Sequence, residues 1–474
     1  MKQDNLSRYF ELIRDIDRVL SRKRNIKACG VDGCLRNYLI SHILKERERV
    51  SVIICPDEKK CKSVYLDCTF FLSEQKEDIQ YPERRVFRFP QYDISPFRGL
   101  SPRRDIVKER LESLFMLSSG GNSVIITSLE ALIFKILPKD EFLKSVDILE
   151  PQEELDLDSL RERLFTLGYR PVSMVEERGD YALRGYVLDI FPPLYSLPIR
   201  IEFWGERIES IRQFNPFNQR SVRSLDEIIL IPFSEVIWRK ENIQRARERG
   251  RLPETVTQVP GFPGQEAWIN HFYRELNTLF DYFPEESLII LLDGENIEEK
   301  AIRMIEKAES EIERYALEAE KREQYFPDTE GIILDMAYLR EEIGKFKKIQ
   351  FVELPFEKRG DEDEVLELFL EDYSYDRLIL ELESKKRLSL APLIGQIRYW
   401  IKAGSRVVVV CSSDSQIERT REIFENYGVR VWDIKGCWGD IPLQRGLYLC
   451  RGDVSGSLYL PQIELFLIDE DSIY

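Results

Sequence analysis

The chain has 474 residues, 43% of them hydrophobic, and a formal net charge of −16 at pH 7. This length exceeds what one hydrophobic core organises, so we expect three or four domains of an ordinary globular protein. The acidic balance argues against a chain built mainly to hold DNA, which needs clustered Lys and Arg, and no apolar run reaches the length of a membrane span.

Strands and helices alternate through residues 1–138, and this pattern indicates a parallel sheet. The expected strands lie at residues 25–29, 50–55, 85–89 and 123–126, and the expected helices begin near residue 35, span residues 103–117 and end at Pro138. The predicted core of this sheet is Val52, Ile53, Ile54, Val124, Ile125, Ile126, Leu288, Ile289 and Ile290.

Residues 139–232 change character, because short β runs follow a single helix at residues 157–167. The β runs lie at residues 186–191, 199–204 and 208–214. Gly205 and Glu206 have the composition of a hairpin turn between the last two runs. We therefore expect a small α+β insert in this part of the chain.

Two further α/β blocks follow the insert. Residues 233–356 contain a basic helical stretch at 239–251, strands at 287–292 and 349–354, and a long charged helix around 302–319. Residues 357–474 start with an acidic run and contain strands at 407–411, 429–434, 447–450 and 463–468, with Ser413 among the N-cap residues of a helix.

A glycine loop between the first strand and the first helix stands where a Walker A phosphate-binding loop would lie. Gly30 and Gly33 are present, but the places of the second glycine, the lysine and the hydroxyl residue hold Leu35, Arg36 and Asn37. A working loop needs those groups for the phosphates and Mg²⁺. The sequence therefore predicts no bound cofactor, and the alternative interpretation is that the glycines only turn the chain.

Cysteine and histidine usage predicts no metal site. The eight cysteines include no CxxC pair, and His42 and His271 have no cysteine or histidine neighbour at ligand spacing. Reduced cysteines within expected strands favour a cytoplasmic protein.

Five segments, in order, resemble the N-terminal half of the bacterial transcription-repair coupling factors, the Mfd family, which is itself similar to the repair protein UvrB. They are residues 89–93 with 105–114, residues 179–192, residues 199–208, residues 281–292 and residues 463–472. The second segment contains GDYALRG and the third reads IRIEFWGERI. The resemblance extends over nearly the whole chain.

The positions at which this chain differs from UvrB show which of the two families, UvrB or Mfd, it resembles more. UvrB has an intact Walker A loop, and its matching strand ends in an acid that holds Mg²⁺, where this chain has Leu292. UvrB also has a long aromatic hairpin that probes DNA, whereas residues 93–102 leave no room for one. The joint loss of these features resembles Mfd rather than UvrB.

The resemblance implies an α/β fold class: a UvrB-like, degenerate P-loop domain interrupted by a small α+β insert and followed by a further α/β domain. It implies domain 1A at residues 1–138, domain 2 at 139–232, domain 1B at 233–356 and domain 3 at 357–474. The chain then resembles an N-terminal fragment. RNA polymerase and DNA would be bound, and ATP-dependent translocation driven, by regions of the full-length factor outside it.

The implied function is that of an adaptor without ATPase activity, which recruits UvrA of nucleotide excision repair to a damage-stalled RNA polymerase. Two alternatives stay open, a UvrB- or helicase-like nucleotide hydrolase and a DNA-binding module. The hydrolase depends on Leu35, Arg36, Asn37 and Leu292, which cannot restore the close backbone approach or the metal ligands. Catalytic residues are therefore not expected.

The resemblance places UvrA docking on the insert. The matching positions are Arg184, Arg200 and Glu202, with weaker matches at Arg170 and Phe191, while Ala182 replaces a further arginine that Arg178 could supply. Independently, residues 200, 202 and 204 alternate with Ile201 and Phe203, so one strand face should carry charge. The alternative is an ordinary charged face or an Arg200–Glu202 pair. We expect Arg184→Ala and Arg200→Glu to weaken docking with nearly unchanged thermal unfolding.

Overall fold

The first sheet is parallel throughout and contains strands from both sides of the insert. The computed structural model describes residues 20, 25–29, 31–45, 47–73, 85–249, 261–293, 297–352, 365–369, 390–434, 438–460 and 463–473. The seven-stranded order is β15-β1-β14-β13-β2-β4-β3. The bounds are β1 Asn25–Cys29, β2 Ser51–Cys55, β3 Val86–Phe89, β4 Val124–Ser128, β13 Leu288–Leu292, β14 Lys347–Val352 and β15 Val365–Phe369.

Helices cover both faces of this sheet. On one face Ile53, Ile126 and Ile290 pack with α3 and α4, and on the other Val52 and Ile125 pack with α5. All nine residues predicted for the core are buried, as the parallel-sheet pattern requires. The helices of this part are α3 Gly33–Lys45, α4 Glu58–Phe71, α5 Arg104–Ser119, α6 Leu129–Leu132, α11 Ile297–Lys321 and α12 Met336–Lys345.

The position of β15 differs from the sequence division. Its residues fall in the block predicted as domain 3, yet Val365–Phe369 pair in parallel with Asn25–Cys29 of β1. By its pairing, this strand belongs to the edge of the first sheet. Strand β15 thereby covers the edge of β1 that does not pair with β14. A division of the chain by composition could not predict this pairing.

The insert forms a separate, mostly antiparallel sheet with the order β11-β10-β9-β8-β7-β6. Its strands are β6 Arg170–Pro171, β7 Asp180–Arg184, β8 Val187–Ile190, β9 Ile199–Trp204, β10 Arg207–Phe214 and β11 Ser221–Ser224. Trp204 pairs with Arg207, and Gly205 has φ of 64°, so the predicted hairpin turn is confirmed. Helix α8, Leu157–Thr166, covers one face with Leu160 and Leu164.

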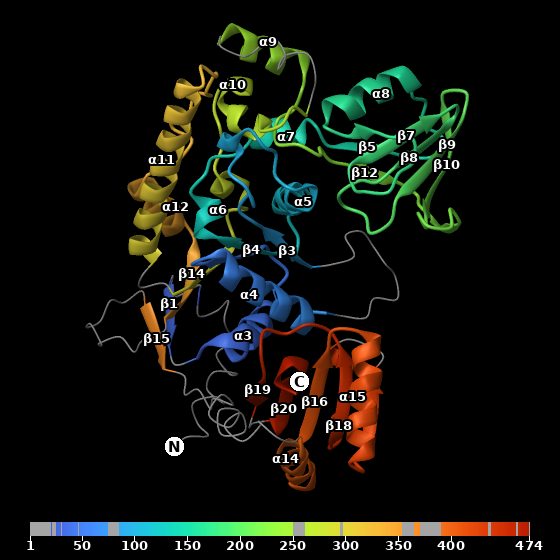
Figure 1. Ribbon diagram of the computed structural model, residues 1–474, viewed down its shortest axis with the longest axis vertical. Coiled ribbons are helices and arrows are strands. Elements are labelled where there is room, and N and C mark those ends of the chain that lie inside the picture. Colours follow the sequence, from blue (N-terminus) through green and yellow to red (C-terminus); the bar gives the residue numbers. More distant parts are fainter. Residues whose placement is uncertain are drawn as a thin grey trace.

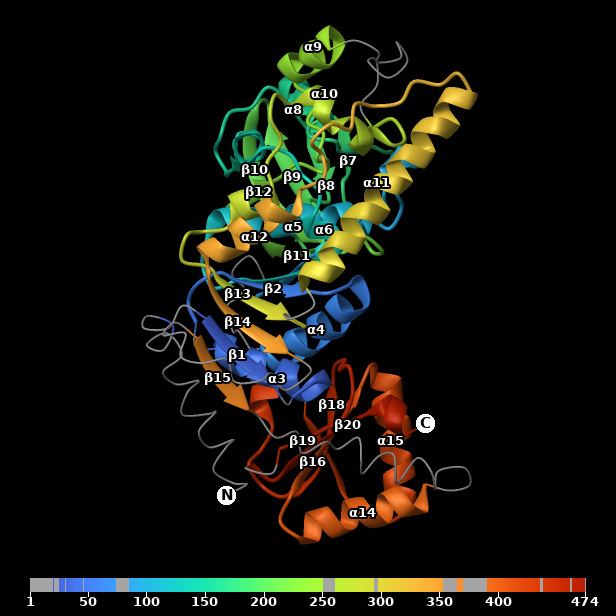
Figure 2. The same cartoon turned by 90° about the vertical axis from the view of Figure 1, so that its left-hand side faces the viewer.

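Short elements join the insert to the first sheet. A small two-stranded sheet pairs β5 Asp147–Leu149 with β12 Ile228–Leu230. The neighbouring helices are α7 Lys139–Leu143, α9 Lys240–Glu248 and α10 Ile269–Phe272. In Figures 1 and 2 the first sheet lies between the insert and the C-terminal unit.

The C-terminal unit is a second α/β layer with a five-stranded sheet in the order β17-β18-β16-β20-β19. Its elements are α14 Ala391–Lys402, β16 Arg406–Cys411, α15 Asp414–Asn426, β17 Val431–Ile434, β18 Gly446–Arg451, β19 Leu458–Leu460 and β20 Leu465–Asp469. Ser413 caps α15 by accepting the N–H of Gln416, as predicted. The antiparallel edge strand β19 was not predicted.

The α/β fold class is therefore confirmed, with a parallel sheet, an inserted antiparallel sheet and a further α/β unit.

Candidate functional site

Strand β9 has one buried face and one exposed face. Ile199, Ile201 and Phe203 are buried against the α8 side, whereas Trp204 is 79% exposed on the opposite side. We call the side of the sheet that carries Arg200, Glu202 and Trp204 the outer face. The alternation predicted from the sequence is confirmed.

A buried carboxylate holds two arginines of the outer face. Asp189 of β8 is 1% exposed and lies opposite Arg200 of β9. Arg200 donates from Nε to Asp189 Oδ1 at 2.7 Å and from Nη2 to Oδ2 at 2.9 Å, and Arg184 Nη2 donates to Oδ2 at 2.6 Å. The hydrogen bond with Asp189 raises the pKa of Arg200. Both guanidinium groups are therefore held by the same carboxylate.

Arg200 and Glu202 form ion pairs with other residues, so the structure does not contain the alternative Arg200–Glu202 pair. Arg200 also donates to Gln219 Oε1 at 2.9 Å and lies over the ring of Phe214, 4.6 Å from its centroid. Glu202 pairs with Arg212 of β10 and accepts from Ser210 Oγ at 3.0 Å. The outer face thus presents two held arginines beside a second ion pair.

The two weaker matches lie to one side of this group. Arg170 donates from Nε to Asp180 Oδ1 at 2.9 Å, and Arg104 of α5 reaches the same oxygen from Nη2 at 3.2 Å. Arg170 therefore sits where the insert meets the first unit. Phe191 is 6% exposed beneath the guanidinium of Arg178, whose Cζ lies 4.8 Å from the ring centroid.

Phe191 also packs with Val175 and Ala182 in a small apolar cluster. Any contribution of Phe191 to docking would act through the position of Arg178, because the ring itself is covered. Arg178 also donates from Nε to the carbonyl of Tyr195 at 3.3 Å, and its replacement of the arginine missing at Ala182 stays a prediction.

Sequence reasoning missed Asp189. Its signal was present, because aspartate is depleted in strands and residues 188 and 190 on either side are apolar. Its period-two position puts it on the face opposite its apolar neighbours. The sequence alone does not give the register that brings it against Arg200.

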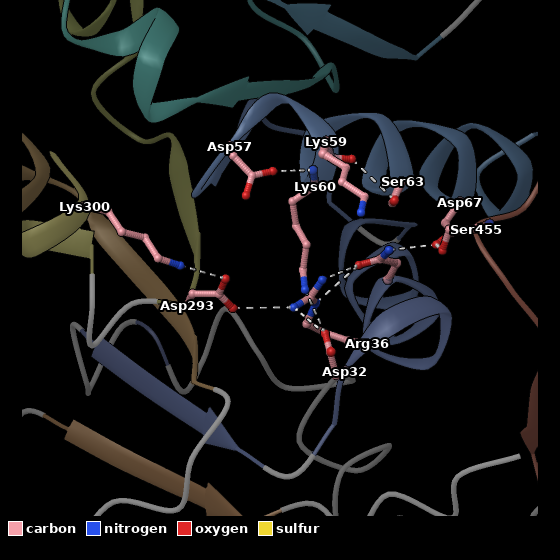
Figure 3. A network of polar contacts seen from close by, with 11 residues as sticks. Asp32, Arg36, Asp57, Lys59, Lys60, Ser63, Asp67, Asp293, Lys300 and Ser455 are labelled. Carbon is pink, nitrogen blue, oxygen red and sulfur yellow. Dashed lines mark hydrogen bonds and ion pairs between the residues drawn. The ribbon is translucent and has the colours of Figure 1, made fainter. Parts of the chain in front are cut away.

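In the degenerate loop, a buried arginine occupies the region where a lysine would meet phosphate (Figure 3). Arg36 is 2% exposed; its Nη1 lies 3.0 Å from Asp32 Oδ1 and 3.9 Å from Asp293 Oδ1. Its Nε donates to Asn37 Oδ1 at 3.3 Å. The protein's own acceptors thus surround this guanidinium.

The rest of the loop is equally unsuited to Mg²⁺. Gly33 has φ of 58° and begins α3, while Gly30 lies outside the described residues. Leu292, at the metal-holding position, is buried within β13. The described part of the chain contains no group of three or more His, Cys, Asp or Glu side chains arranged to hold a metal.

Asn37, at the hydroxyl position of the loop, takes part in a different contact. Its Nδ2 donates to Asp67 Oδ2 of α4 at 2.7 Å. The same buried carboxylate accepts the N–H of Ser455 at 2.6 Å and its hydroxyl at 2.5 Å. Asp67 therefore links the loop helix to the C-terminal unit.

A cavity of about 320 Å³ lies elsewhere in the first unit, between the segment after β3 and helix α11. Arg110 stacks between the rings of Phe89 and Tyr92 and donates from Nε to Glu235 Oε1 at 2.5 Å. Glu266 lines the same cavity, and burial raises its pKa to about 7. Residues 89–93, with the sequence FPQYD, therefore contribute to this buried polar cluster.

Comparison with known proteins identifies the insert. Residues 148–235 match the model of the UvrB interaction domain, and this range contains the outer face.

Curated relatives extend the match along the chain. The transcription-repair-coupling factor of Myxococcus xanthus is 28% identical over 439 residues, which cover 86% of this chain and 35% of that protein. The factor of Bacillus subtilis is 24% identical over 480 residues, covering 94% and 38%, and that of Haemophilus influenzae is 29% identical over 287 residues, covering 58% and 24%. The chain is thus similar to the transcription-repair-coupling factors over most of its length, which confirms the resemblance drawn from the five segments.

The chain spans about a third of the length of the Myxococcus relative. None of the helices formed by the described residues combines the length and hydropathy of a membrane span.

Proposed function

We propose that the chain is a non-catalytic adaptor that recruits UvrA to RNA polymerase stalled at DNA damage. The outer face of the insert, built around Asp189, is the docking surface. The observation that carries this proposal is the placement of Arg184 and Arg200 on one buried carboxylate, within the region that matches the UvrB interaction domain. RNA polymerase and DNA would be bound by other regions of a longer factor, in the cytoplasm.

The electrostatics of the outer face suit an acidic partner. Two arginines share one carboxylate, so this group carries a net positive charge, and Arg184 has a side chain 54% exposed. Arginine pairs with carboxylates through two parallel hydrogen bonds. Because Asp189 already fixes both guanidinium groups, docking costs little side-chain entropy.

Rejection of the nucleotide-hydrolase alternative rests on Arg36 and Leu292. The first is bound by the protein's own carboxylates, and the second offers no ligand atom. Phosphoryl transfer depends on positioned charge and metal ions. The DNA-binding alternative gains no support from a chain of net charge −16.

We retain the division into domains at residues 138, 232 and 356 as part of the proposal, with β15 added to the first sheet through its pairing with β1. In this division the insert begins with α7 and ends before α9.

Capture of purified UvrA by the immobilised intact chain tests the proposal. The parent chain should retain UvrA, and Arg184→Ala should lose most of the retention, because Arg200 still compensates Asp189 and the fold stays intact. Arg161→Ala is the matched control: this arginine lies on α8, on the other side of the sheet, and is 56% exposed. Equal retention by all three chains would place docking elsewhere.

Excess UvrB adds a second arm to this experiment. If the outer face uses the surface of UvrA that receives UvrB, free UvrB should displace the chain in proportion to its concentration. Retention that does not change with UvrB would mean that the chain uses a different surface of UvrA.

A further inference from the structure

Two hairpin turns lie side by side at one end of the outer face. Tyr186 occupies the turn between β7 and β8, and Trp204 ends β9 at its turn into β10. The N–H of Phe203 donates to the carbonyl of Tyr186 at 2.9 Å, which ties the two turns together. Gly185 and Gly205 have φ of 59° and 64°, values that permit these tight turns.

Both aromatic side chains at this end are open to solvent. Tyr186 is 60% and Trp204 79% exposed, although rings of this size bury roughly 150–250 Å² when they pack. Trp204 lies on the same face as Arg200 and Glu202, and Arg184 immediately precedes the turn that holds Tyr186. Trp, Tyr and Arg are the residues most enriched among interface hot spots.

We propose that Tyr186 and Trp204 form the apolar anchor of the UvrA-docking surface and enter an apolar pocket of UvrA flanked by carboxylates. This inference rests on the proposed function. The held arginines supply orientation and charge, and the aromatic rings supply the buried area that slows dissociation.

Binding of UvrA to the intact chain, measured by biolayer interferometry, tests the anchor. Trp204→Ala and Tyr186→Ala should each weaken binding roughly tenfold or more, mainly through faster dissociation, with unfolding unchanged because both rings are exposed. The control is Phe217→Ala, since Phe217 is 96% exposed in the loop at the opposite end of β10. It should bind like the parent.

The outcomes separate the two claims. If Arg184→Ala loses binding while Trp204→Ala and Tyr186→Ala match the parent, docking stands and the aromatic anchor is refuted. If the parent chain does not bind UvrA, the proposed function fails first. If Phe217→Ala is as weak as Trp204→Ala, the anchor is not confined to the two hairpin turns and the inference is overturned.

An independent observation concerns the joint between the first unit and the C-terminal unit. The contact of Asp67 with Ser455 is buried, and Gly452 passes so close to Phe70 that a Cβ atom there would lie 2.5 Å from the ring. Trp438 packs on Phe71 with ring centroids 5.0 Å apart. One apolar cluster runs continuously across this boundary.

The geometry points to a structural role for the degenerate loop and helix α3. Through the contact of Asn37 with Asp67, α3 helps to fix the C-terminal unit against the first sheet as one rigid body. Three donors converge on one buried carboxylate, and such a group is costly to leave unpaired. A carboxylate held in this way allows one relative orientation of the two units.

Hydrogen–deuterium exchange on the intact chain tests this joint. Gly452→Ala, which collides with Phe70, and Asp67→Asn, which puts an amide donor against these donors, should both accelerate exchange in α4 and in residues 452–460. Gly456→Ala is the matched control, because a Cβ there meets nothing within 4 Å. Exchange at parental rates in both Gly452→Ala and Asp67→Asn would refute the joint.

Discussion

At the scale of single residues, Arg36 shows how a guanidinium group is accommodated inside the protein core. A fully buried guanidinium is tolerated only where acceptors surround it, and Asp32, Asn37 and Asp293 do so here. The side chain that replaces the phosphate-binding lysine has become part of the core.

Replacing Arg36 by alanine should therefore destabilise the chain, by about 3 kcal/mol, because it opens a cavity in the core and leaves buried Asp293 with Lys300 as its remaining cation. Chemical denaturation followed by circular dichroism measures the loss. Lys60→Ala is the control, since Lys60 is half-buried and its pair with Asp32 lies near the surface, where a pair is worth about 1 kcal/mol or less. A loss for Arg36→Ala no greater than that of the control would contradict this account.

Glu266 predicts a pH dependence of stability. Burial raises its pKa from 4.5 to about 7, so between these values the folded chain holds a proton that the unfolded chain has released. The contribution of Glu266 to the free energy of unfolding is therefore fully present below pH 4.5 and is lost as the pH rises through about 7. Glu266→Gln should reduce this loss.

The measurement compares melting temperatures at pH 5 and pH 8 for the parent, Glu266→Gln and a surface control, Glu206→Gln. Only Glu266→Gln should show a smaller drop than the parent. The same drop in all three chains would show that Glu266 does not titrate in this range.

Residue types and spacing predicted part of the outer face of the insert. Arg184, Arg200 and Glu202 follow from the resemblance and from the alternation along β9, and the outer face confirms their common side. The role of Asp189 was not predictable, because it depends on the pairing of β8 with β9, which is a property of the register and not of local pattern.

At the scale of elements, the pairing of strands β8 and β9 changes the effect on stability that we expect from Arg200→Glu. Arg200→Glu would place a second carboxylate beside buried Asp189. The expectation that thermal unfolding stays nearly unchanged no longer holds for this variant. We now expect a loss of stability of about 3 kcal/mol, because a buried carboxylate loses one of its partners and gains a like charge.

Thermal unfolding of Arg200→Glu, Arg200→Gln and Arg184→Ala tests this point. The order of melting temperatures should be Arg184→Ala highest and Arg200→Glu lowest, because only the latter adds repulsion. A melting temperature of Arg200→Glu equal to that of Arg184→Ala would show that Asp189 tolerates a second carboxylate next to it.

Element boundaries followed the sequence where periodicity was strong. Strand β9 has the predicted bounds, and α5 and α8 are close to theirs. The short strands β6 and β19, of two and three residues, could not be predicted, because a run of two or three residues is too short to show an alternation of apolar and polar side chains. Strand β15 was missed as a member of the first sheet because its partner, β1, lies more than 300 residues away in the chain.

At the scale of the whole molecule, the first unit is a parallel α/β sheet whose glycine loop lacks the phosphate- and metal-binding residues of a Walker A loop. We expect neither binding nor hydrolysis of Mg-ATP, because the second glycine, lysine, hydroxyl and metal ligand are all replaced. Calorimetric titration with Mg-ATP should show no saturable heat. Turnover that disappears in Arg36→Ala would contradict this expectation.

Long-range contacts of the whole molecule lay beyond sequence reasoning. Asp67 and Ser455 are separated by 388 positions, and nothing in either segment signals the other. The order of domains, in contrast, followed from five short segments, because their sequence order reflects the order of the units along the chain.

The dissociation constant of the intact chain for UvrA tests the central claim most directly. Isothermal titration of UvrA into the parent, Arg184→Ala and Arg161→Ala should give saturable binding for the parent and the Arg161→Ala control. It should give binding weaker by roughly tenfold or more for Arg184→Ala, since charged interface anchors commonly cost this much when truncated. No binding by the parent, or equal constants for all three chains, would contradict the assignment of the outer face as the UvrA-docking surface.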